Sequence, residues 1–339
     1  MYCRNIKLKM SELRFILSDY FNILEENLNA QYLQCKYIPV SFDSSDSTDS
    51  LWKKHDSTLK KMNVCDVEPE QSLIDLKIEI ANRIFHCCSF CERRCLVDRE
   101  KTSGKCNVMG ARITSEFLHL GEETVLIPSH TIFFSGCTFQ CVFCQNWEIS
   151  QKMSGFYVGP EKLANIIIER RGEGARNVNW VGGDPTPNLP YILKILKELT
   201  VNVPQIWNSN MYCSKETMNL LNGIIDVYLT DFKFGNDDCA KELSKVDNYI
   251  QIIKRNHKIA YNQGEMIVRH LILPNHVRCC SKHILEWISN EIPEVAVNLM
   301  DQYRPEYRAY EYADLGRSIL KEEYTQVKDF AEKLKIHVI

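Results

Sequence analysis

The chain has 339 residues, of which 45% are hydrophobic and 25% charged, a composition typical of soluble globular proteins. Its net charge of −3 does not favour a protein that binds nucleic acid or anionic membranes. No run of 18 apolar residues occurs, and the N-terminal segment MYCRNIKLKM lacks the apolar stretch of a secretory signal. We therefore expect a cytoplasmic protein without a membrane span.

Cysteine is the unusual feature of this composition. The chain contains 15 cysteines, and eight of them fall between Cys87 and Cys144. Disulfide frameworks suit small secreted domains, whereas clustered thiols in a reducing compartment more often bind metal or carry redox chemistry. We therefore expect metal-bound thiolates in this part of the chain rather than disulfides.

The chain is expected to begin with a helical extension, residues 1–85. Apolar side chains recur at helical spacing over residues 11–33, and a segment rich in Ser and Asp at 41–50 predicts a solvated loop. Two further helices are expected at Leu51–Lys61 and Ser72–Phe85. The second of these leads into a cysteine-rich segment.

From Thr131 onward, strand-like and helix-like segments alternate. Strands are expected at Thr131–Phe134, Val178–Val181, Gln205–Trp207, Asp226–Thr230, Met266–Leu273 and Val295–Leu299. Helices are expected at Pro160–Arg171, Leu189–Leu199, Lys215–Leu221, Asp238–Arg255 and Lys282–Asn290. This alternation predicts a parallel sheet with right-handed crossovers.

The length of this region limits the architecture. A complete eight-unit barrel needs about 250 residues, which is more than this region offers. We therefore expect the α/β class and a partial (β/α)6 TIM-type barrel over residues 125–310. A metal-binding segment at 86–124 precedes it, and a helix at Leu315–Leu334, within residues 311–339, follows. An open doubly wound sheet is the competing arrangement, but no G-x-G-x-x-G follows the first strand.

The most informative motif follows the first expected strand. Cys137, Cys141 and Cys144 form a C-x3-C-x2-C triplet in the run GCTFQCVFCQN. Thiolates select iron–sulfur clusters, zinc or copper(I), and a closed zinc site would need a fourth ligand such as the distant His130. Three thiolates can instead hold three corners of a [4Fe–4S] cluster. One iron would then be open at the C-terminal mouth of the barrel, where βα loops build active sites.

Two segments after later strands add polar groups at the same mouth. Gly182 and Gly183 permit close approach of the backbone to a ligand, and Asp184 can accept a hydrogen bond from an ammonium group; a plain turn is the alternative. Asp231 and Lys233 follow the fourth strand, where a capping aspartate and a solvated lysine are the alternatives.

A second cysteine group lies upstream of the barrel. Cys88, Cys91, Cys95 and Cys106 give the pattern C-x2-C-x3-C-x10-C, with Cys87 as a substitute ligand. Four thiolates so close together predict a closed metal site. Zinc would be structural there, and an auxiliary iron–sulfur cluster would be structural or relay electrons. The spacing does not separate these two.

The triplet resembles the C-x3-C-x-aromatic-C signature of the radical S-adenosylmethionine (radical SAM) superfamily, with Phe143 as the aromatic residue. The resemblance implies that the open iron binds the amino and carboxylate groups of S-adenosylmethionine (SAM). One electron then cleaves SAM to methionine and a 5′-deoxyadenosyl radical, which abstracts hydrogen from a substrate. The resemblance also implies an electron donor such as flavodoxin or ferredoxin.

The same resemblance assigns roles to particular residues. Asp184 occupies the place of the usual Glu in the family's GGE motif, which contacts the SAM amino group. Lys233 matches the lysine that binds the SAM carboxylate in glycyl-radical activating enzymes. Arg269 matches the arginine of a V/I-R-Y-x-x-x-P segment and can pair with Asp231 across the mouth. Lys233 and Arg269 are therefore expected to be catalytic.

Further contacts follow from the same comparison. The segment Trp207–Asn210 resembles the D-T-N-G segment of those enzymes, so that Asn208 and Ser209, with Asp231, are expected to shape the SAM pocket or a cation site. Phe143 is expected near the adenine.

The upstream cysteines narrow the resemblance to a group related to pyruvate formate-lyase activating enzyme. The match covers about residues 70–310 and is carried by FLHLGEE, TIFFSGC, FCQNWEISQ, LTDFKFG, RHLILP and NLMDQYRPEY. Two enzymatic functions are compatible with it: activation of a partner protein by forming a glycyl radical, and modification of a peptide or small molecule. An iron–sulfur or zinc protein without catalysis is the alternative. Gln302, Tyr303 and Arg304 are expected to touch substrate or to form a polar loop.

Overall fold

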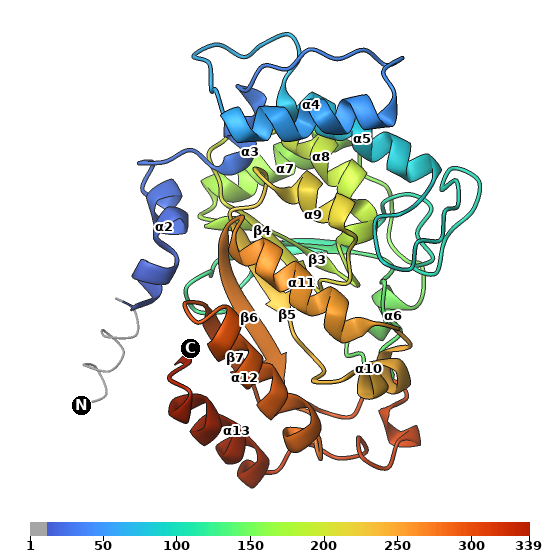
Figure 1. The fold of residues 1–339 in the computed structure, drawn as a ribbon, viewed down its shortest axis with the longest axis vertical. Helices are drawn as coiled ribbons and strands as arrows, with labels where there is room; N and C mark the ends of the chain where they lie inside the picture. The colour runs from blue at the N-terminus through green and yellow to red at the C-terminus, as the bar shows by residue number, and fades with distance from the viewer. Residues whose placement is uncertain (1–11) are drawn as a thin grey trace.

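An eight-stranded sheet, whose strand order follows the chain, forms the centre of this computed structural model, which describes residues 12–339 (Figure 1). Strands β2 to β8 are parallel, and β1 pairs antiparallel with β2 at one edge. The strands are β1 Ile113–His119, β2 Ser129–Phe134, β3 Asn177–Gly182, β4 Gln205–Ser209, β5 Val227–Asp231, β6 Glu265–Leu271, β7 Ala296–Met300 and β8 His337–Val338. The prediction that residues 1–10 form no secretory signal concerns residues outside the described part of the chain, as does Ser11 of the first predicted helix.

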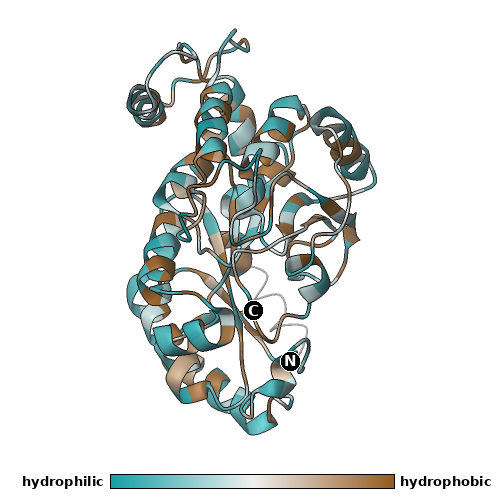
Figure 2. Cartoon of the chain, turned by 90° about the vertical axis from the view of Figure 1, so that its right-hand side faces the viewer, coloured by the Kyte–Doolittle hydropathy of each residue, from teal (hydrophilic) through white to brown (hydrophobic). Residues whose placement is uncertain are grey.

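Helices follow the parallel strands and cover the outside of the sheet. They are α7 Pro160–Gly172, α8 Leu189–Glu198, α9 Lys215–Leu221, α10 Asp237–Ser244, α11 Tyr249–Tyr261 and α12 Lys282–Glu291. The prediction of an α/β fold with a partial TIM-type barrel is confirmed. Hydrophilic and hydrophobic residues mix along these helices (Figure 2), as expected where one helix face packs on a sheet.

Several predicted elements differ from the structure, and the first helix predicted within residues 11–33 is interrupted after Leu24. The helix expected at Asp238–Arg255 is split into α10 and α11, because Lys245 and Asn248 adopt left-handed backbone conformations with φ of 56° and 52°. The helix expected at Leu315–Leu334 begins later, as α13 Lys321–Lys333. The apolar end beyond it forms β8, which pairs with β7, and β1 was not predicted.

The N-terminal extension consists of α2 Ser18–Leu24, α3 Gln31–Lys36, α4 Thr48–Lys61 and α5 Leu73–His86. Helix α5 packs on α8 of the barrel, and α4 lies over α5 at the top of Figure 1. Shorter elements complete the described chain: α6 Trp147–Ser150, η1 Thr186–Asn188, η2 Val277–Ser281 and η3 Ala309–Glu311. No helix within residues 12–339 is long and apolar enough to cross a membrane.

The extension also closes one end of the barrel. Leu17 and Tyr20 are buried in a cluster with Val227 and Ile267, which lie in the first half of strands β5 and β6. The carboxylate of Glu265 accepts hydrogen bonds from backbone N–H groups at the start of α2, at 2.6 and 2.8 Å. Apolar side chains therefore fill much of this end of the barrel.

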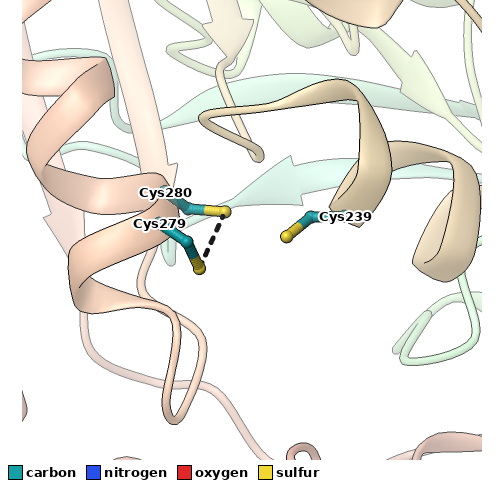
Figure 3. Close-up of side chains that lie close together, drawn as sticks. All are labelled: Cys239, Cys279 and Cys280. Atoms are coloured by element: carbon teal, nitrogen blue, oxygen red, sulfur yellow. Dashed lines mark hydrogen bonds between the residues drawn. The ribbon is translucent and has the colours of Figure 1, made fainter.

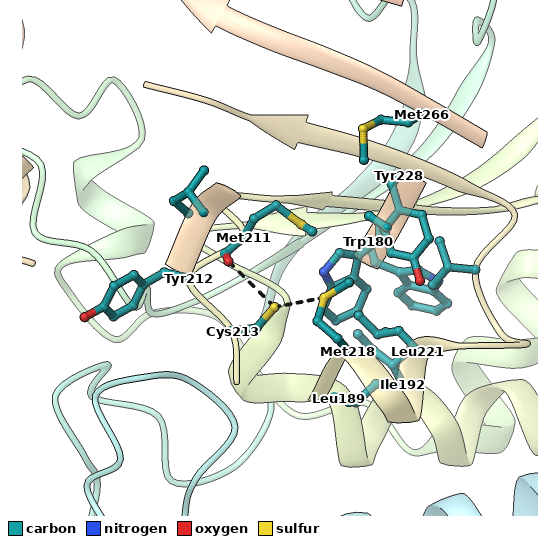
Figure 4. Packing of buried hydrophobic residues seen from close by; sticks show 14 of the residues in the cluster. Trp180, Leu189, Ile192, Met211, Tyr212, Cys213, Met218, Leu221, Tyr228 and Met266 are labelled. Atoms are coloured by element: carbon teal, nitrogen blue, oxygen red, sulfur yellow. Dashed lines mark hydrogen bonds between the residues drawn. The ribbon is translucent and has the colours of Figure 1, made fainter. Parts of the chain in front are cut away.

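A second buried layer lies between the strands and the outer helices (Figure 4). Trp180 of β3 is fully buried there and donates a hydrogen bond from Nε1 to Oε1 of Gln205, at 2.9 Å. The thiol of Cys213 lies in the same layer, 3.3 Å from Sδ of Met218. Cys213 is therefore a packing residue of this layer.

Candidate active site

Side chains at the C-terminal ends of the strands continue the columns of residues that fill the barrel. Because side chains alternate along a strand, Leu229 and Asp231 of β5 face the same side, as do Ile267 and Arg269 of β6. Leu229 and Ile267 belong to the apolar cluster at the closed end. Asp231 and Arg269 instead line a cavity of about 240 Å³ at the open end. In β5 and β6 the inward-facing column therefore changes from apolar to charged toward the open end.

The cysteine triplet forms one wall of this cavity. Cys137, Cys141 and Cys144, in the loop after β2, all line it. Oxygen or nitrogen donors lie beside each sulfur: Sγ of Cys137 accepts a hydrogen bond from the Phe139 N–H, at 3.3 Å. Sγ of Cys141 lies 2.9 Å from Oγ of Ser244. Such hydrogen bonds tune the potential of iron–sulfur clusters.

Burial controls the protonation of these thiols. It raises the pKa of Cys141 to about 12, and the charge of neighbouring Cys144 adds to this effect. Burial also raises the pKa of Cys137 and of Cys144 above the ordinary value for a thiol. The three thiols are therefore protonated at neutral pH without metal, and a metal must displace the protons when it binds.

Glycines bring the end of β3 against the triplet loop. A Cβ atom on Gly183 would lie 2.0 Å from the carbonyl oxygen of Gly136, and one on Gly182 would lie 2.2 Å from the backbone nitrogen of Phe134. Gly182 also has a φ of 128°, which favours glycine. Both glycines line the cavity, so backbone atoms form its surface at this point.

Asp184 does not line this cavity, although it follows the two glycines. Its fully buried carboxylate accepts hydrogen bonds from the hydroxyl groups of Thr138, Thr186 and Ser209, at 2.7, 2.8 and 3.1 Å. The N–H of Thr186 donates another, at 3.0 Å. Asp184 and Ser209 therefore tie the β3 and β4 loops to the triplet loop, and direct contact with a ligand would require these bonds to break.

Opposite the triplet, charged side chains form a connected group. Lys233 Nζ lies 2.6 Å from Oδ2 of Asp231, and Arg269 Nη2 lies 3.0 Å from Oδ1 of the same carboxylate. Arg269 also donates a hydrogen bond to Oδ1 of Asn208. Asn208 lines the cavity, and its buried Nδ2 has no hydrogen-bond partner among the described residues. An unpaired donor at this position suits a ligand that accepts hydrogen bonds.

The charges in this group stabilise one another. Burial would raise the pKa of Asp231, but Arg269 and Lys233 outweigh burial and lower the pKa below its ordinary value. Burial works to lower the pKa of Lys233, and the charge of Asp231 overcomes it and raises that pKa. All three side chains are therefore ionised at neutral pH, and two of them are cations.

Comparison with known proteins agrees with this arrangement. The family model described as Radical SAM superfamily matches residues 131–288. An uncharacterised protein of Methanocaldococcus jannaschii is 46% identical over 336 residues, which cover 95% of this chain and 99% of that protein. The chain belongs to the radical SAM superfamily. The triplet, the paired glycines and the charged group thus lie in a radical SAM barrel.

One more distant sequence relative and two structural neighbours carry functional names. The pyruvate formate-lyase-activating enzyme of Staphylococcus epidermidis is 25% identical over 161 residues, or 43% of this chain and 62% of that enzyme. SuiB of Streptococcus suis, solved with precursor peptide SuiA, has a TM-score of 0.46 and 12% identity over 60% of this chain and 46% of that chain. A radical SAM methyltransferase from Sphaerobacter thermophilus has a TM-score of 0.45 and 13% identity over 89% and 94% of the chains.

The upstream cysteines gather beside the radical SAM barrel. Burial raises the pKa of Cys91, and the charges of Cys106, Cys88 and Cys95 raise it further, which reflects their proximity. The backbone N–H of Lys105 donates a hydrogen bond to Sγ of Cys95, at 3.4 Å. The four predicted ligands are thus near enough for their charges to interact, but they are not among the described groups whose ligand atoms all lie within 4.8 Å of one another.

Two contacts join this upstream segment to the triplet loop. The guanidinium of Arg93 donates two hydrogen bonds to the carbonyl oxygen of Thr138, both at 3.2 Å. On the other side of Cys137, a Cβ atom on Gly136 would lie 2.7 Å from the carbonyl oxygen of Cys106. The loop that carries the triplet is thus held between the upstream segment and the end of β3.

Among the predicted contacts not yet described, Phe143 lines the cavity, whereas Tyr303 and Arg304 do not. Phe143 lines the cavity, and its ring centroid lies 6.1 Å from that of Tyr303. Tyr303 itself is buried and donates a hydrogen bond from its hydroxyl to the carbonyl oxygen of Leu315, at 2.8 Å. Tyr303 is thus a support for Phe143, and exposed Arg304 pairs with Glu306, at 3.1 Å.

Sequence reasoning missed two residues of the site. Ser244 at the end of α10 lies against Cys141, and no motif marks it because the contact spans about a hundred positions of sequence. Thr138 lies inside the triplet run, so its position could have indicated a role. Its hydroxyl donates a hydrogen bond to Asp184 and accepts one from Asn210, at 2.7 and 2.9 Å.

We predict that Asp184→Ala lowers the free energy of unfolding by about 2–4 kcal/mol, because buried donors lose their acceptor. Urea unfolding of the purified protein measures this change. Asp301→Ala, which truncates an exposed aspartate at the same end of the barrel, is the matched control. Equal stability of the two variants would show that the Asp184 hydrogen bonds do not hold the loops together.

Proposed function

We propose that this protein is a radical SAM enzyme that cleaves SAM reductively and abstracts hydrogen from a substrate at the open end of the barrel. Cys137, Cys141 and Cys144 would hold the [4Fe–4S] cluster. The observation that carries this proposal is a cavity that has Cys137, Cys141 and the half-buried Cys144 on one wall and Lys233 and Arg269 on the other. A protein that only stores metal does not need that second wall.

The residues present fit both cofactors. Three thiols would supply three ligands of a four-iron cluster and leave one iron for SAM, which offers an amino group and a carboxylate. The backbone of Gly182 and Gly183 forms a surface that a ligand can approach without meeting side chains. The unpaired Nδ2 of Asn208 provides a donor toward the same cavity.

Each protein group has a physical role in the proposed reaction. Lys233 and Arg269 would attract the SAM carboxylate, and Asp231 orients both cations by hydrogen bonds. Phe143 would pack against the adenine, since its ring lines the cavity. When bound by Cys137, Cys141 and Cys144, a [4Fe–4S] cluster would supply the electron for reductive cleavage of SAM. Buried side chains on the cavity walls would limit the access of water to reactive species.

We further propose a polypeptide substrate whose glycine loses a hydrogen atom. The similarity to the pyruvate formate-lyase-activating enzyme of S. epidermidis supports this choice. Trp147 follows the triplet closely and stacks on Tyr307, with ring centroids 5.3 Å apart. Tyr307 is 40% exposed. Aromatic side chains near the mouth suit a protein partner, because aromatic residues are enriched in protein interfaces.

The decisive experiment is anaerobic reconstitution with iron and sulfide, followed by SAM and dithionite. Wild-type protein should accumulate 5′-deoxyadenosine, measured by liquid chromatography. Cys141→Ala should form none because a cluster ligand is lost, whereas Cys65→Ala, at an exposed cysteine, should match wild type. The proposal fails if iron-loaded wild type and Cys141→Ala give the same amount.

The role of Lys233 is tested by SAM affinity. Its ammonium would contribute a charged hydrogen bond to the SAM carboxylate, so Lys233→Met should weaken binding by about 10- to 100-fold. Anaerobic calorimetry measures the dissociation constant, and iron content should stay unchanged. Lys241→Met removes an exposed lysine of α10 and is the control. An unchanged constant for Lys233→Met would remove this lysine from the SAM site.

We also propose a second metal centre at Cys88, Cys91, Cys95 and Cys106, either zinc or an auxiliary iron–sulfur cluster. Its contacts with the triplet loop through Arg93 support a structural role or an electron relay. The triple variant with Cys137, Cys141 and Cys144 changed to Ala should retain metal, and adding Cys91→Ala should release it. Elemental analysis of the difference identifies iron or zinc, and no difference would exclude the site.

A further inference from the structure

Three cysteines outside both predicted metal sites meet at the outer surface of the barrel. Cys239 lies in α10, and Cys279 and Cys280 lie in η2, a single π-helical turn before α12. Their sulfur atoms all lie within 4.8 Å of one another. Figure 3 shows Cys239 facing the other two across the space between the two helices. These sulfurs come from segments about forty residues apart in sequence.

The spacing of the sulfurs suits one metal ion. A tetrahedral zinc ion binds thiolates at about 2.3 Å, which places two such sulfurs about 3.8 Å apart. The sulfurs of Cys279 and Cys280 lie 3.9 Å apart. This separation is far beyond the length of a disulfide bond, about 2.05 Å. The observed distance therefore matches two ligands of a single ion.

Polar and steric contacts hold this group in place. The side chain of Asn236 accepts a hydrogen bond from the N–H of Cys239, at 2.8 Å, and donates one to the carbonyl oxygen of Cys279, at 2.9 Å. A Cβ atom on Gly235 would lie 2.6 Å from the same carbonyl oxygen, so only glycine permits this approach. Nε2 of His270 lies 2.8 Å from Oγ of Ser281, which joins η2 to β6.

The π-helical turn has a direct consequence for the ligands. Such turns occur mostly as single insertions in α-helices and are frequent at functional sites. Here the turn presents two adjacent cysteines toward Cys239. Thiolates are soft ligands and select zinc, copper(I) or iron–sulfur clusters. Among these, the single-ion spacing favours zinc.

We propose that Cys239, Cys279 and Cys280 bind one Zn²⁺ ion through three thiolates. Cys279 lines an open groove of about 420 Å³ together with Lys254 and Trp287, so solvent can supply the fourth ligand. Nothing in this site requires the cluster or SAM, and zinc binding stands apart from the proposed catalytic function.

The ion would stabilise the segment that connects two walls of the active site. Cys239 lies near the start of α10, and the carbonyl oxygens of Leu243 and Ser244 at its end accept hydrogen bonds from the N–H groups of Val142 and Gln140 in the triplet loop, at 2.9 and 3.0 Å. Gly235 follows Lys233 by two positions. Zinc would thus fix α10 against η2 behind both the cluster loop and the charged group.

The test measures zinc on the anaerobically reconstituted full chain. Protein is equilibrated with Zn²⁺ and desalted, and bound zinc and iron are counted by mass spectrometry. Cys239→Ser and Cys279→Ser should each hold one zinc ion fewer per chain than wild type, with iron unchanged. Cys65→Ser, at an exposed cysteine, should keep the wild-type content. Equal zinc content in all four proteins would overturn the proposal.

A second measurement on wild-type protein does not depend on folding of the variants. Iodoacetamide labelling of Cys239 and Cys279, followed by peptide mass spectrometry, should slow at least tenfold when Zn²⁺ is added. The rate at Cys65 should not change, because its thiol lies outside the site. Unchanged labelling of Cys239 and Cys279 would also overturn the proposal.

Discussion

The close backbone packing around Gly136 is the constraint on which the active-site geometry depends. The carbonyl oxygen of Cys106 lies on one side of this residue, and the Gly183 backbone approaches its carbonyl oxygen on the other. A Cβ atom on Gly183 would lie 2.0 Å from backbone, and one on Gly136 would lie 2.3 Å from Cγ2 of Val108 and 2.7 Å from the carbonyl oxygen of Cys106. A side chain at either glycine would therefore force these segments apart. Three loops therefore meet at one point, next to the first cysteine of the triplet.

This packing explains why a buried carboxylate is found beside the glycines. Asp184 directly follows Gly183, and its carboxylate accepts hydrogen bonds from hydroxyl groups of the triplet loop and of β4. Burial of a carboxylate is costly unless such donors surround it. Burial raises the pKa of Asp184 despite these hydrogen bonds. Asp184 thus links the loops by hydrogen bonds, and backbone atoms of Gly182 and Gly183 line the cavity beside it.

The charged wall of the cavity is stabilised by ion pairs between its own side chains. Asp231 lies between two cations, and the mutual attraction of these groups offsets the loss of hydration. Both cations remain charged at the mouth of the barrel, where an anionic group can be recognised. The closed end is filled by apolar side chains of the extension, including Leu17. Along β5 and β6, apolar side chains thus lie toward the closed end and charged side chains toward the open end.

The parallel strands and most helices could be predicted from the sequence, because alternating and helical apolar patterns depend on local burial. The break between α10 and α11 could not, since left-handed conformations at Lys245 and Asn248 leave no pattern in the sequence. Strand β8 was also missed as a strand, because two residues at a sheet edge are extended only through pairing with β7.

The sequence alone determined the superfamily, because three cysteines at short spacing and an aromatic residue form a local motif. It also indicated Lys233 and Arg269, which lie at the ends of recognisable strands. Only the tertiary structure showed that Asp184 accepts hydrogen bonds from three hydroxyl groups and that Ser244 meets Cys141. The same holds for the meeting of Cys239 with Cys279. These contacts join segments distant in sequence, and their positions are set by packing of helices on the sheet.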